Sequence, residues 1–185
     1  MKVWFTSDNH FFHRNVIKYC NRPFNNAEEM NEEMIRLWNE TVDTKDTVYL
    51  LGDFAFTNTK GVEALVKRLN GHIHWIWGNH DESMKNANGF VWSGHYKEVK
   101  VDKQKFILSH YPMLSWNGSG KGSIMLHGHC HGSLKDDETQ LRMDVGVDCH
   151  NFKPISSEFI IEEMNKRKAN NLAKFEKEFV PIDHH

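Results

Sequence analysis

Apolar runs of strand length alternate with longer amphipathic segments over the first half of the chain. The apolar runs cover residues 3–6, 47–51 and 73–77, and a polar cluster follows each of them. Between them, residues 27–42 and 62–69 carry apolar side chains at the spacing of one helix face, so two helices are predicted there. The order strand, helix, strand, helix, strand predicts parallel strands joined by crossover helices.

The second half of the chain has a different pattern. Residues 96–101 and 104–109 are strand-like, and only two residues separate them, which predicts a β-hairpin. Two further short strands are predicted at residues 124–126 and 141–147. This half is therefore expected to be rich in short strands rather than in crossover helices.

A final helix is predicted from about residue 156 to residue 175, with Ser156 or Ser157 at its start. No internal repeat and no linker rich in Gly, Pro or Ser marks a boundary, so we expect a single domain over residues 1–185. The charged tail, about residues 176–185, is expected to be flexible, and its closing histidine pair is either native or the remnant of a tag. The apolar face of the helix is predicted to consist of Phe159, Ile160 and Met164.

Composition and charge narrow the classes of function. The 185 residues include 23 Lys or Arg and 25 Asp or Glu, so the formal net charge is −2. Bulk positive charge is thereby excluded as the force that would hold nucleic acid or an anionic membrane. The apolar opening is too short for a signal peptide, and no run reaches the ~18 residues of a membrane span. Three widely spaced cysteines do not form a disulfide framework, so we expect reduced thiols in a soluble, cytoplasmic protein without a membrane partner.

The candidate chemistry lies in the polar clusters that end the predicted strands. In an open α/β sheet these ends meet at one edge, where ligands bind. Neutral imidazoles combined with carboxylate or amide oxygens suit borderline divalent metals, whereas a structural zinc site would use pairs of cysteines. The clusters contain Asp8, His10, Asp53, Asn79, His80, Asp81, His110, His129 and His131.

Charge counting favours a phosphate ester as the substrate. Two divalent ions bring four positive charges, and Asp8 together with Asp53 would neutralise two of them, which leaves about +2. Two ions ~3.5–4 Å apart can share a carboxylate and a hydroxide, lower the pKa of bound water, and clamp the attacking and leaving oxygens. This is the chemistry of phosphoester hydrolysis.

The order and spacing of the clusters resemble the calcineurin-like metallophosphoesterase family. The surrounding sequence, including Arg22-Pro23-Phe24, is similar to the small stand-alone members of bacteria and their phages, which implies the cytoplasm of a bacterial or phage-infected cell. The resemblance implies an α/β fold of the αββα sandwich type, with helices flanking two mixed β-sheets, in place of the single open sheet that periodicity predicts. The blocks that carry it are Asp8-Asn9-His10, Gly52-Asp53, Gly78-Asn79-His80-Asp81, His110 and Gly128-His129-Cys130-His131.

The resemblance also implies roles for these residues. Asp53 would bridge two metal ions, a bridging hydroxide would attack phosphorus in line, and His80 would stabilise the developing charge or protonate the leaving oxygen. Asp81 would orient His80. By this resemblance one metal ion would be held by Asp8, His10, Asp53 and His131, and the other by Asp53, Asn79, His110 and His129.

The expected activity is a dinuclear, metal-dependent hydrolysis of a small phosphodiester or nucleotide-type ester, with phosphodiesters favoured over monoesters. The expected cofactors are two divalent metal ions, Mn first, with Fe, Zn, Ni or Co also compatible. Two alternatives stay open: a nuclease, and a non-catalytic metal-binding scaffold. A nuclease would want a basic groove with stacking aromatics, so nucleic acid is a possible but not a favoured partner. The sequence leaves the natural substrate and the oligomeric state open.

Candidate substrate contacts lie outside the five blocks. Arg14 and Arg22 follow the first block and are candidates for contact with a phosphate or base. The glycine-rich run at residues 117–123 does not have the spacing of a phosphate-binding loop. We interpret it either as a loop that brings Trp116 and Lys121 to the metals for substrate contact or as a mobile connection.

Overall fold

The first β-sheet brings together strands from both ends of the sequence. The structure, a computed structural model, describes residues 1–135 and 137–178, so most of the expected flexible tail and the closing histidine pair lie outside the described residues. The sheet has the order β4-β3-β2-β1-β9, in which β9 alone is antiparallel to its neighbour. Its strands are β1 (Val3–Thr6), β2 (Thr47–Leu51), β3 (His72–Ile76), β4 (Trp92–Gly94) and β9 (Ile155–Ser156).

The second sheet has the order β5-β6-β7-β8. Its antiparallel pair is the predicted hairpin, and its two remaining pairings are parallel, so both sheets are mixed. The hairpin turn consists of Asp102 and Lys103, both with positive φ (48° and 67°), as a two-residue turn matched to the strand twist requires. The strands are β5 (Tyr96–Val101), β6 (Gln104–Ser109), β7 (Ile124–His127) and β8 (Arg142–Asp144).

Four α-helices accompany the sheets: α1 (Arg14–Tyr19), α2 (Ala27–Thr41), α3 (Thr59–Val66) and α4 (Ser157–Glu178). The N-cap of α2 is Asn26, whose side chain accepts a hydrogen bond from Glu29 N at 2.8 Å. Short 3₁₀ helices lie at Glu82–Met84 (η1), Ser119–Lys121 (η2) and Val147–Cys149 (η3). Within the described part of the chain, no helix is both long and apolar enough to cross a membrane.

Two apolar cores separate these layers. The first lies between the helices α1 to α3 and one face of the first sheet, where Trp38 of α2 and Trp75 of β3 are fully buried. The second lies between the two sheets, where Phe5 packs on Phe106 with ring centroids 5.2 Å apart. Side chains on successive strand residues point to opposite faces, so β2 supplies both cores. Replacing Phe106 with Ala would cost ~3–5 kcal/mol of stability.

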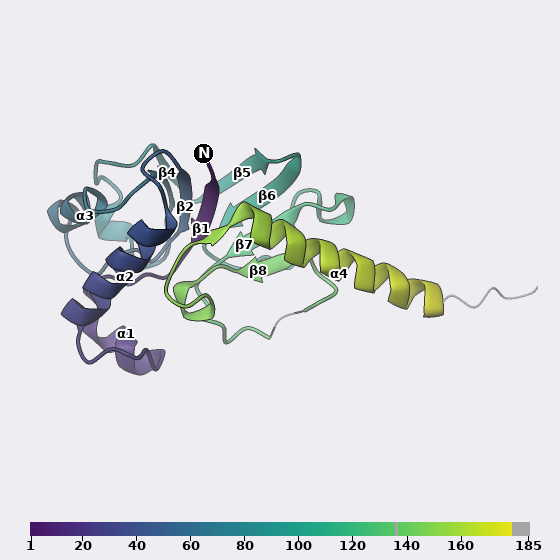
Figure 1. Ribbon diagram of the computed structural model, residues 1–185, viewed down its shortest axis with the longest axis horizontal. Helices are drawn as coiled ribbons and strands as arrows, with labels where there is room; N and C mark the ends of the chain where they lie inside the picture. Colours follow the sequence, from purple (N-terminus) through teal and green to yellow (C-terminus); the bar gives the residue numbers. More distant parts are fainter. Residues whose placement is uncertain (136, 179–185) are drawn as a thin grey trace, which may run out of the picture.

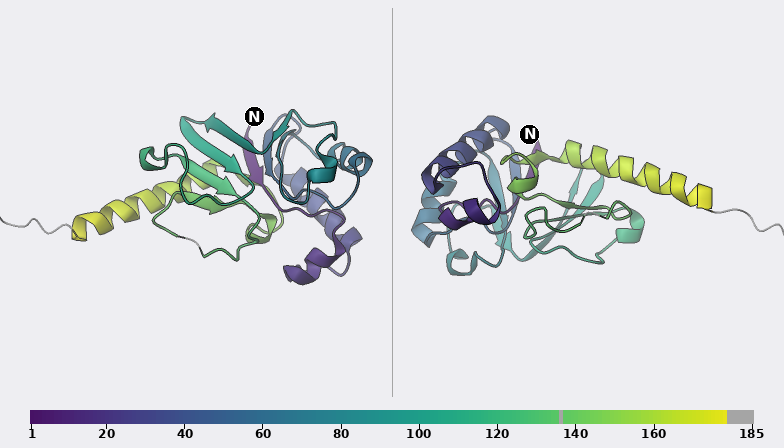
Figure 2. Two further views of the ribbon diagram at one scale, coloured as in Figure 1. Left: turned by 180° about the vertical axis from the view of Figure 1, so that it is seen from behind. Right: turned by 90° about the horizontal axis from the view of Figure 1, so that it is seen from below.

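The layers confirm the predicted sandwich of two mixed sheets flanked by helices. Helices α1, α2 and α3 cover the first sheet, and α4 runs alongside the second sheet and beyond it (Figure 1 and Figure 2). The short elements α1, β4 and β9 were not predicted, because runs of two to six residues carry too little periodicity. The second predicted helix ends at Val66 rather than near residue 69, and the strand predicted at residues 141–147 is only Arg142–Asp144.

The predicted apolar face of α4 needs one correction. Ile160 and Met164 are fully buried in the second core, one helical turn apart, whereas the side chain of Phe159 is 43% exposed. Adjacent helix positions differ by ~100° around the axis, so Phe159 turns away from the face that its neighbour buries. Phe159 N donates a hydrogen bond to Ser156 Oγ at 3.1 Å, so the predicted capping role falls to Ser156.

Candidate metal centre

The polar clusters of both sheets meet because the strands that precede them run side by side. In the first sheet, β1, β2 and β3 are parallel, and Thr6 pairs with Leu50 while Leu51 pairs with Ile76. The loops that follow are tied together, since Asp8 N donates to Gly52 O and His10 N donates to Asp53 O, both at 3.0 Å. The loops after β1 and β2 therefore form one rigid edge.

The second sheet joins this edge through its own parallel strands. Gly128 N donates to His110 O at 3.0 Å, which ties the loop after β7 to the end of β6. The backbone N–H of His129 points to the carboxylate of Asp8, 2.9 and 3.0 Å from its two oxygens. Asp8 thus links the two sheets, although 121 residues separate it from His129.

The backbone is unusual at most of the candidate ligands. Positive φ values are uncommon outside glycine, and sparsely populated backbone conformations cost ~1–3 kcal/mol and concentrate at functional sites. Asp and His are among the residue types that tolerate this conformation best. The residues in this conformation are Asp8 (φ 56°), His10 (51°), Asp53 (51°), His129 (68°) and His131 (48°).

These side chains form groups that could each hold a metal ion. One group is Asp8, His10 and His131, and another is Asp53, His110 and His129; in each, one potential ligand atom per residue lies within 4.8 Å of the others. A further group, Cys20 with His131 and Asp148, shares a histidine with the first.

Asp53 stands between the two main groups. Its Oδ2 lies 3.6 Å from His10 Nε2 and 3.5 Å from His110 Nε2. Asn79 joins the second group, because its Oδ1 lies 3.0 Å from His110 Nε2. His110 Nδ1 donates to the carbonyl oxygen of Leu51 at 2.8 Å, so Nε2 is the ring nitrogen that faces both Asn79 and Asp53.

The donor set fits divalent cations. His10 Nε2 is a buried polar atom that lacks a hydrogen-bond partner among the described residues. A native protein rarely leaves such an atom unsatisfied, and a neutral imidazole nitrogen beside carboxylate oxygens is a ligand for borderline divalent metals. The residues present therefore suit the metal ions that the sequence predicts.

Burial shifts the protonation of the first group strongly. It raises the pKa of Asp8 to about 8, although the nearby His131 and the hydroxyl of Ser7 act in the opposite direction. Burial, together with the positive charges of His131 and Arg22, lowers the pKa of His10 to about 2. His10 is thus a neutral candidate ligand at physiological pH, whereas Asp8 would have to release a proton before it could bind a cation.

His131 is held by a residue that the sequence analysis missed. Its Nδ1 lies 2.7 Å from Asp148 Oδ2, which leaves its Nε2 on the side of Asp8, 4.0 Å from Oδ1. Burial by itself lowers the pKa of His131, but the hydrogen bond that its ring donates to Asp148 and the negative charges nearby outweigh burial and raise the pKa. Asp148 lies in η3, and no spacing or motif in the sequence marks it.

Asp81 does not orient His80, as was expected, but holds backbone amides. Its carboxylate accepts hydrogen bonds from the backbone N–H groups of Gly78 (2.7 Å), Asp53 (2.8 Å) and Phe54 (3.0 Å). Those three amides take up the contacts described for this fully buried side chain, so Asp81 fixes the loop of Asp53 rather than the ring of His80. Burial raises its pKa to about 6, although the same hydrogen bonds oppose the shift.

His80 lies at the open side of the centre. Its backbone N–H donates to Asp53 Oδ1 at 2.9 Å, and its side chain, 42% exposed, has Nε2 3.9 Å from Asp53 Oδ2. The ring centroid lies 5.4 Å from that of His10. His80 can therefore reach both the candidate ligands and a molecule that arrives from solvent.

Comparison with known proteins decides the family. The family model described as calcineurin-like phosphoesterase matches residues 1–180. The chain belongs to the calcineurin-like phosphoesterase family. This confirms the resemblance carried by the five blocks of sequence, and it makes the protein a metal-dependent phosphoesterase whose cofactors are divalent metal ions.

Proteins similar to it in sequence come from an archaeon and a phage, and a bacterial protein shares its fold. This calcineurin-like phosphoesterase is 37% identical over 175 residues to the uncharacterized protein MJ1445 of Methanocaldococcus jannaschii, a match that covers 91% of this chain and 94% of that one. It is 26% identical over 163 residues to the Gene 66 protein of Mycobacterium phage L5, covering 71% and 78% of the two chains. The crystal structure of the Aquifex aeolicus protein of unknown function AQ665 shares its fold, with a TM-score of 0.69, 24% identity and coverage of 87% and 98%.

Arg22 of this phosphoesterase is not placed to meet a substrate. Its side chain is fully buried, and it donates to both carboxylate oxygens of Asp148 at 2.8 Å and to the carbonyl oxygens of Asp8 (2.7 Å) and Asn9 (2.8 Å). All three guanidinium nitrogens are engaged, so the expected contact with a phosphate is corrected to support for the loop of Asp8. Arg14 is exposed at the start of α1 and stays a candidate contact.

Trp116 and Lys121 lie at the wrong end of the second sheet for contact with the metals. Gly122 O accepts a hydrogen bond from the side chain of Gln104, the first residue of β6. The five-residue advance from there to Ser109, beside His110, spans roughly 16 Å at ~3.3 Å per residue. Trp116 Nε1 donates to Ser123 O at 3.2 Å, just before β7 begins.

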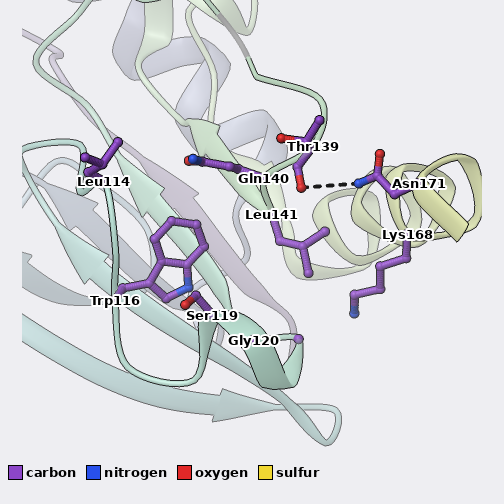
Figure 3. Close-up of a pocket in the computed structure, with 10 residues that line it drawn as sticks. Leu114, Trp116, Ser119, Gly120, Thr139, Gln140, Leu141, Lys168 and Asn171 are labelled. Carbon is purple, nitrogen blue, oxygen red and sulfur yellow. Dashed lines mark hydrogen bonds between the residues drawn. The ribbon is translucent and has the colours of Figure 1, made fainter. Parts of the chain in front are cut away.

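Trp116 instead lines a separate pocket of about 630 Å³. Figure 3 shows its indole between Leu114 and Leu141, with Lys168 and Asn171 of α4 on the far side. Of the two interpretations of the glycine-rich loop, the structure argues against substrate contact, because the loop runs back along the sheet instead of staying beside His110.

Proposed function

We propose that this phosphoesterase is a dinuclear enzyme that hydrolyses phosphodiester or nucleotide-type esters. The observation that carries the proposal is the position of Asp53 Oδ2, 3.6 Å from His10 Nε2 and 3.5 Å from His110 Nε2, which suits a carboxylate that two ions share. One ion would be held by Asp8, His10, Asp53 and His131, and the other by Asp53, Asn79, His110 and His129.

Charge supports a phosphate ester as the substrate. With Asp8 and Asp53 as the anionic ligands, two divalent ions leave the centre at about +2, which favours an anion. The ions would supply a hydroxide at neutral pH and would neutralise charge on the attacking and leaving oxygens. Borderline nitrogen and oxygen donors are compatible with Mn, our first candidate, and with Fe, Zn, Ni or Co.

The chain itself would position the reaction. His80 is the exposed imidazole beside Asp53, and it would protonate the leaving oxygen or stabilise the developing charge. Asp81 would act as a positioning residue, because its carboxylate holds the backbone N–H groups of Asp53 and Gly78. In-line attack requires the nucleophile and the leaving oxygen to lie on opposite sides of phosphorus, and the exposure of His80 leaves its side open to the leaving group.

The test is hydrolysis of bis-p-nitrophenyl phosphate and p-nitrophenyl phosphate by metal-stripped protein after Mn is added back. We expect Mn-dependent turnover with preference for the diester. In the variant His80→Ala, kcat should fall by about 10²–10⁴-fold while bound Mn is retained, since general acid catalysis contributes that much. In Asp53→Asn, both turnover and the stoichiometry of bound Mn should fall.

His72→Ala provides the matched control. His72 is an exposed histidine at the amino end of β3, the strand whose other end leads to His80, so its removal should leave turnover unchanged. Protein that binds two Mn ions but hydrolyses neither ester would contradict the proposal and favour the scaffold alternative. Preference for single-stranded nucleic acid over both small esters, with a steep dependence on salt, would favour a nuclease.

A further inference from the structure

A cavity of about 310 Å³ adjoins the candidate metal centre on the side of His80. We refer to it as the Phe56 cavity. His80 is one of its walls, and the same imidazole lies 3.9 Å from Asp53 Oδ2, so cavity and metal centre share a side chain. A molecule whose phosphate sits at the metals could therefore place an attached group in the cavity. Its lining residues are Ala55, Phe56, Thr57, His80, Ser83 and Met84.

Phe56 is an exposed aromatic side chain held in a defined place. Its side chain is 56% exposed, yet its backbone N–H donates to Phe11 O at 2.7 Å, within the bridge that joins Phe11 to Ala55. Its ring stacks on that of His13 with centroids 4.6 Å apart and an interplanar angle of 17°. His80 approaches edge-on, with its centroid 6.2 Å from that of Phe56. Contacts with His13 and His80 thus hold the ring of Phe56 in place, while much of its surface faces solvent.

The lining of the cavity favours uncharged groups over charged ones. Apart from His80, none of its lining residues has an ionisable side chain. The exposed ring of Phe56 supplies most of the apolar surface, because Ala55 and Met84 are almost fully buried, and Thr57 and Ser83 carry hydroxyl groups. A charged substituent would lose its hydration there without gaining a partner. A flat, uncharged ring would stack on Phe56 and could use the hydroxyls as hydrogen-bond partners. The volume lies at the lower end of the range for small-molecule pockets, which suits one ring system.

We propose that the Phe56 cavity binds a planar, uncharged ring carried by the phosphate ester, with Phe56 as the stacking surface. The inference rests on the proposed function, because it assumes that the phosphate of the ligand occupies the metal centre. Nucleobases and simple aryl groups share this chemistry. Phe56 is then a specificity-determining residue that contributes to binding rather than to bond cleavage.

The experiment measures binding rather than turnover. Calorimetric titration of Mn-loaded protein compares adenosine monophosphate with ribose 5-phosphate, and phenyl phosphate with methyl phosphate. Each pair shares a phosphate group and differs by the ring. We expect the ring-bearing member of each pair to bind about tenfold more tightly to the wild type. If the ring improves binding only for adenosine monophosphate, the site is specific for a nucleobase. If it improves binding equally for phenyl phosphate, the site accepts aromatic rings in general.

Variants at Phe56 carry the decisive comparison. In Phe56→Ala the tenfold preference should fall to about one, with ribose 5-phosphate and Mn affinities unchanged, and in Phe56→Trp it should persist. Phe159→Ala removes an aromatic ring of similar exposure on α4 and should leave the preference intact. The inference would be overturned if the wild type bound both members of each pair with equal affinity, or if the preference for the ring-bearing member survived in Phe56→Ala. A preference that depends on Phe56 in a protein without phosphoesterase activity would overturn the proposed function and leave the ring cavity standing.

Discussion

The imidazole of His131 is clamped by Asp148, with 2.7 Å between Nδ1 and Oδ2. The same carboxylate receives two hydrogen bonds from the buried guanidinium of Arg22. Burial raises the pKa of Asp148, but the hydrogen bonds from His131 and Arg22 outweigh it, so the net shift is downward and the group stays ionised. An ionised carboxylate fixes the tautomer of the ring and leaves His131 Nε2 as the nitrogen that can bind a metal.

Replacing Asp148 with Asn should weaken metal binding by about 10–100-fold, because the partner that orients His131 and raises its basicity is lost. Calorimetric titration of metal-free protein with Mn measures this. The matched control is Asp43→Asn, an exposed carboxylate in the loop before β2, which should bind Mn like the wild type. Equal Mn affinity in Asp148→Asn and wild type would show that His131 is not a ligand or does not need this support.

Replacing Arg22 with Ala should lower the free energy of unfolding by ~3–5 kcal/mol, because it removes a fully buried guanidinium and the two hydrogen bonds that it donates to the largely buried carboxylate of Asp148. Arg14→Ala, which removes an exposed side chain of α1, should leave stability unchanged. Urea denaturation of the metal-free proteins separates the two. If Arg22→Ala instead kept wild-type stability but lost phosphoesterase activity, Arg22 would contact the substrate after all, despite its burial.

Metal affinity should depend on pH through Asp8. Its pKa in the metal-free protein is raised to about 8, so a bound ion must displace a proton at lower pH. The apparent Mn affinity should therefore fall as pH drops below about 8, approaching tenfold per pH unit for this one proton. His10, with its pKa lowered to about 2, adds no competing proton, whereas the raised pKa of His131 steepens the slope. Affinity that is flat between pH 6 and pH 8 would contradict the protonated state of Asp8.

The same protonation predicts the stability of the metal-free protein. Between pH 6.5 and 8, Asp8 is ionised in the unfolded chain but still binds a proton in the folded one, so the free energy of unfolding should fall as pH rises. Below pH 6.5 His10 works in the opposite direction, because it takes up a proton only on unfolding. Chemical denaturation across this pH range checks the sign of the change in the free energy of unfolding. Excess Mn should remove the loss of stability at high pH.

Two glycines leave room for the carboxylates of the centre. A Cβ at Gly78 would overlap with Asp53 Oδ1, and one at Gly128 would overlap with Ser7 Oγ and with Asp8 Oδ2. Gly78→Ala and Gly128→Ala should each displace the carboxylate and weaken Mn binding by tenfold or more, while Gly120→Ala, where a Cβ meets nothing within 4 Å, should not. Mn titration with far-UV circular dichroism distinguishes a displaced ligand from an unfolded chain. Wild-type affinity in both variants would contradict the placement of Asp8 and Asp53.

Local patterns were sufficient for much of the fold. The hairpin at Asp102 and Lys103 and the helix capped by Asn26 depend on neighbouring residues, so their pattern in the sequence predicts them directly. The extra short strands β4 and β9 exist only because a sheet edge is available to pair with them, which no local window contains. Phe159 shows the same limit on a helix, where one position decides between core and solvent.

The sequence by itself determined the chemistry of this protein: which residue types end each strand, and hence that Asp, Asn and His would gather at one sheet edge. Only the tertiary structure decided which partners support them. Asp148 reaches Arg22 across 126 residues of sequence, and the loop of Trp116 turns away from His110 along the sheet. The physical reason is that periodicity and strand-end chemistry are local properties, whereas contacts between distant segments follow from how two sheets pack on a shared core.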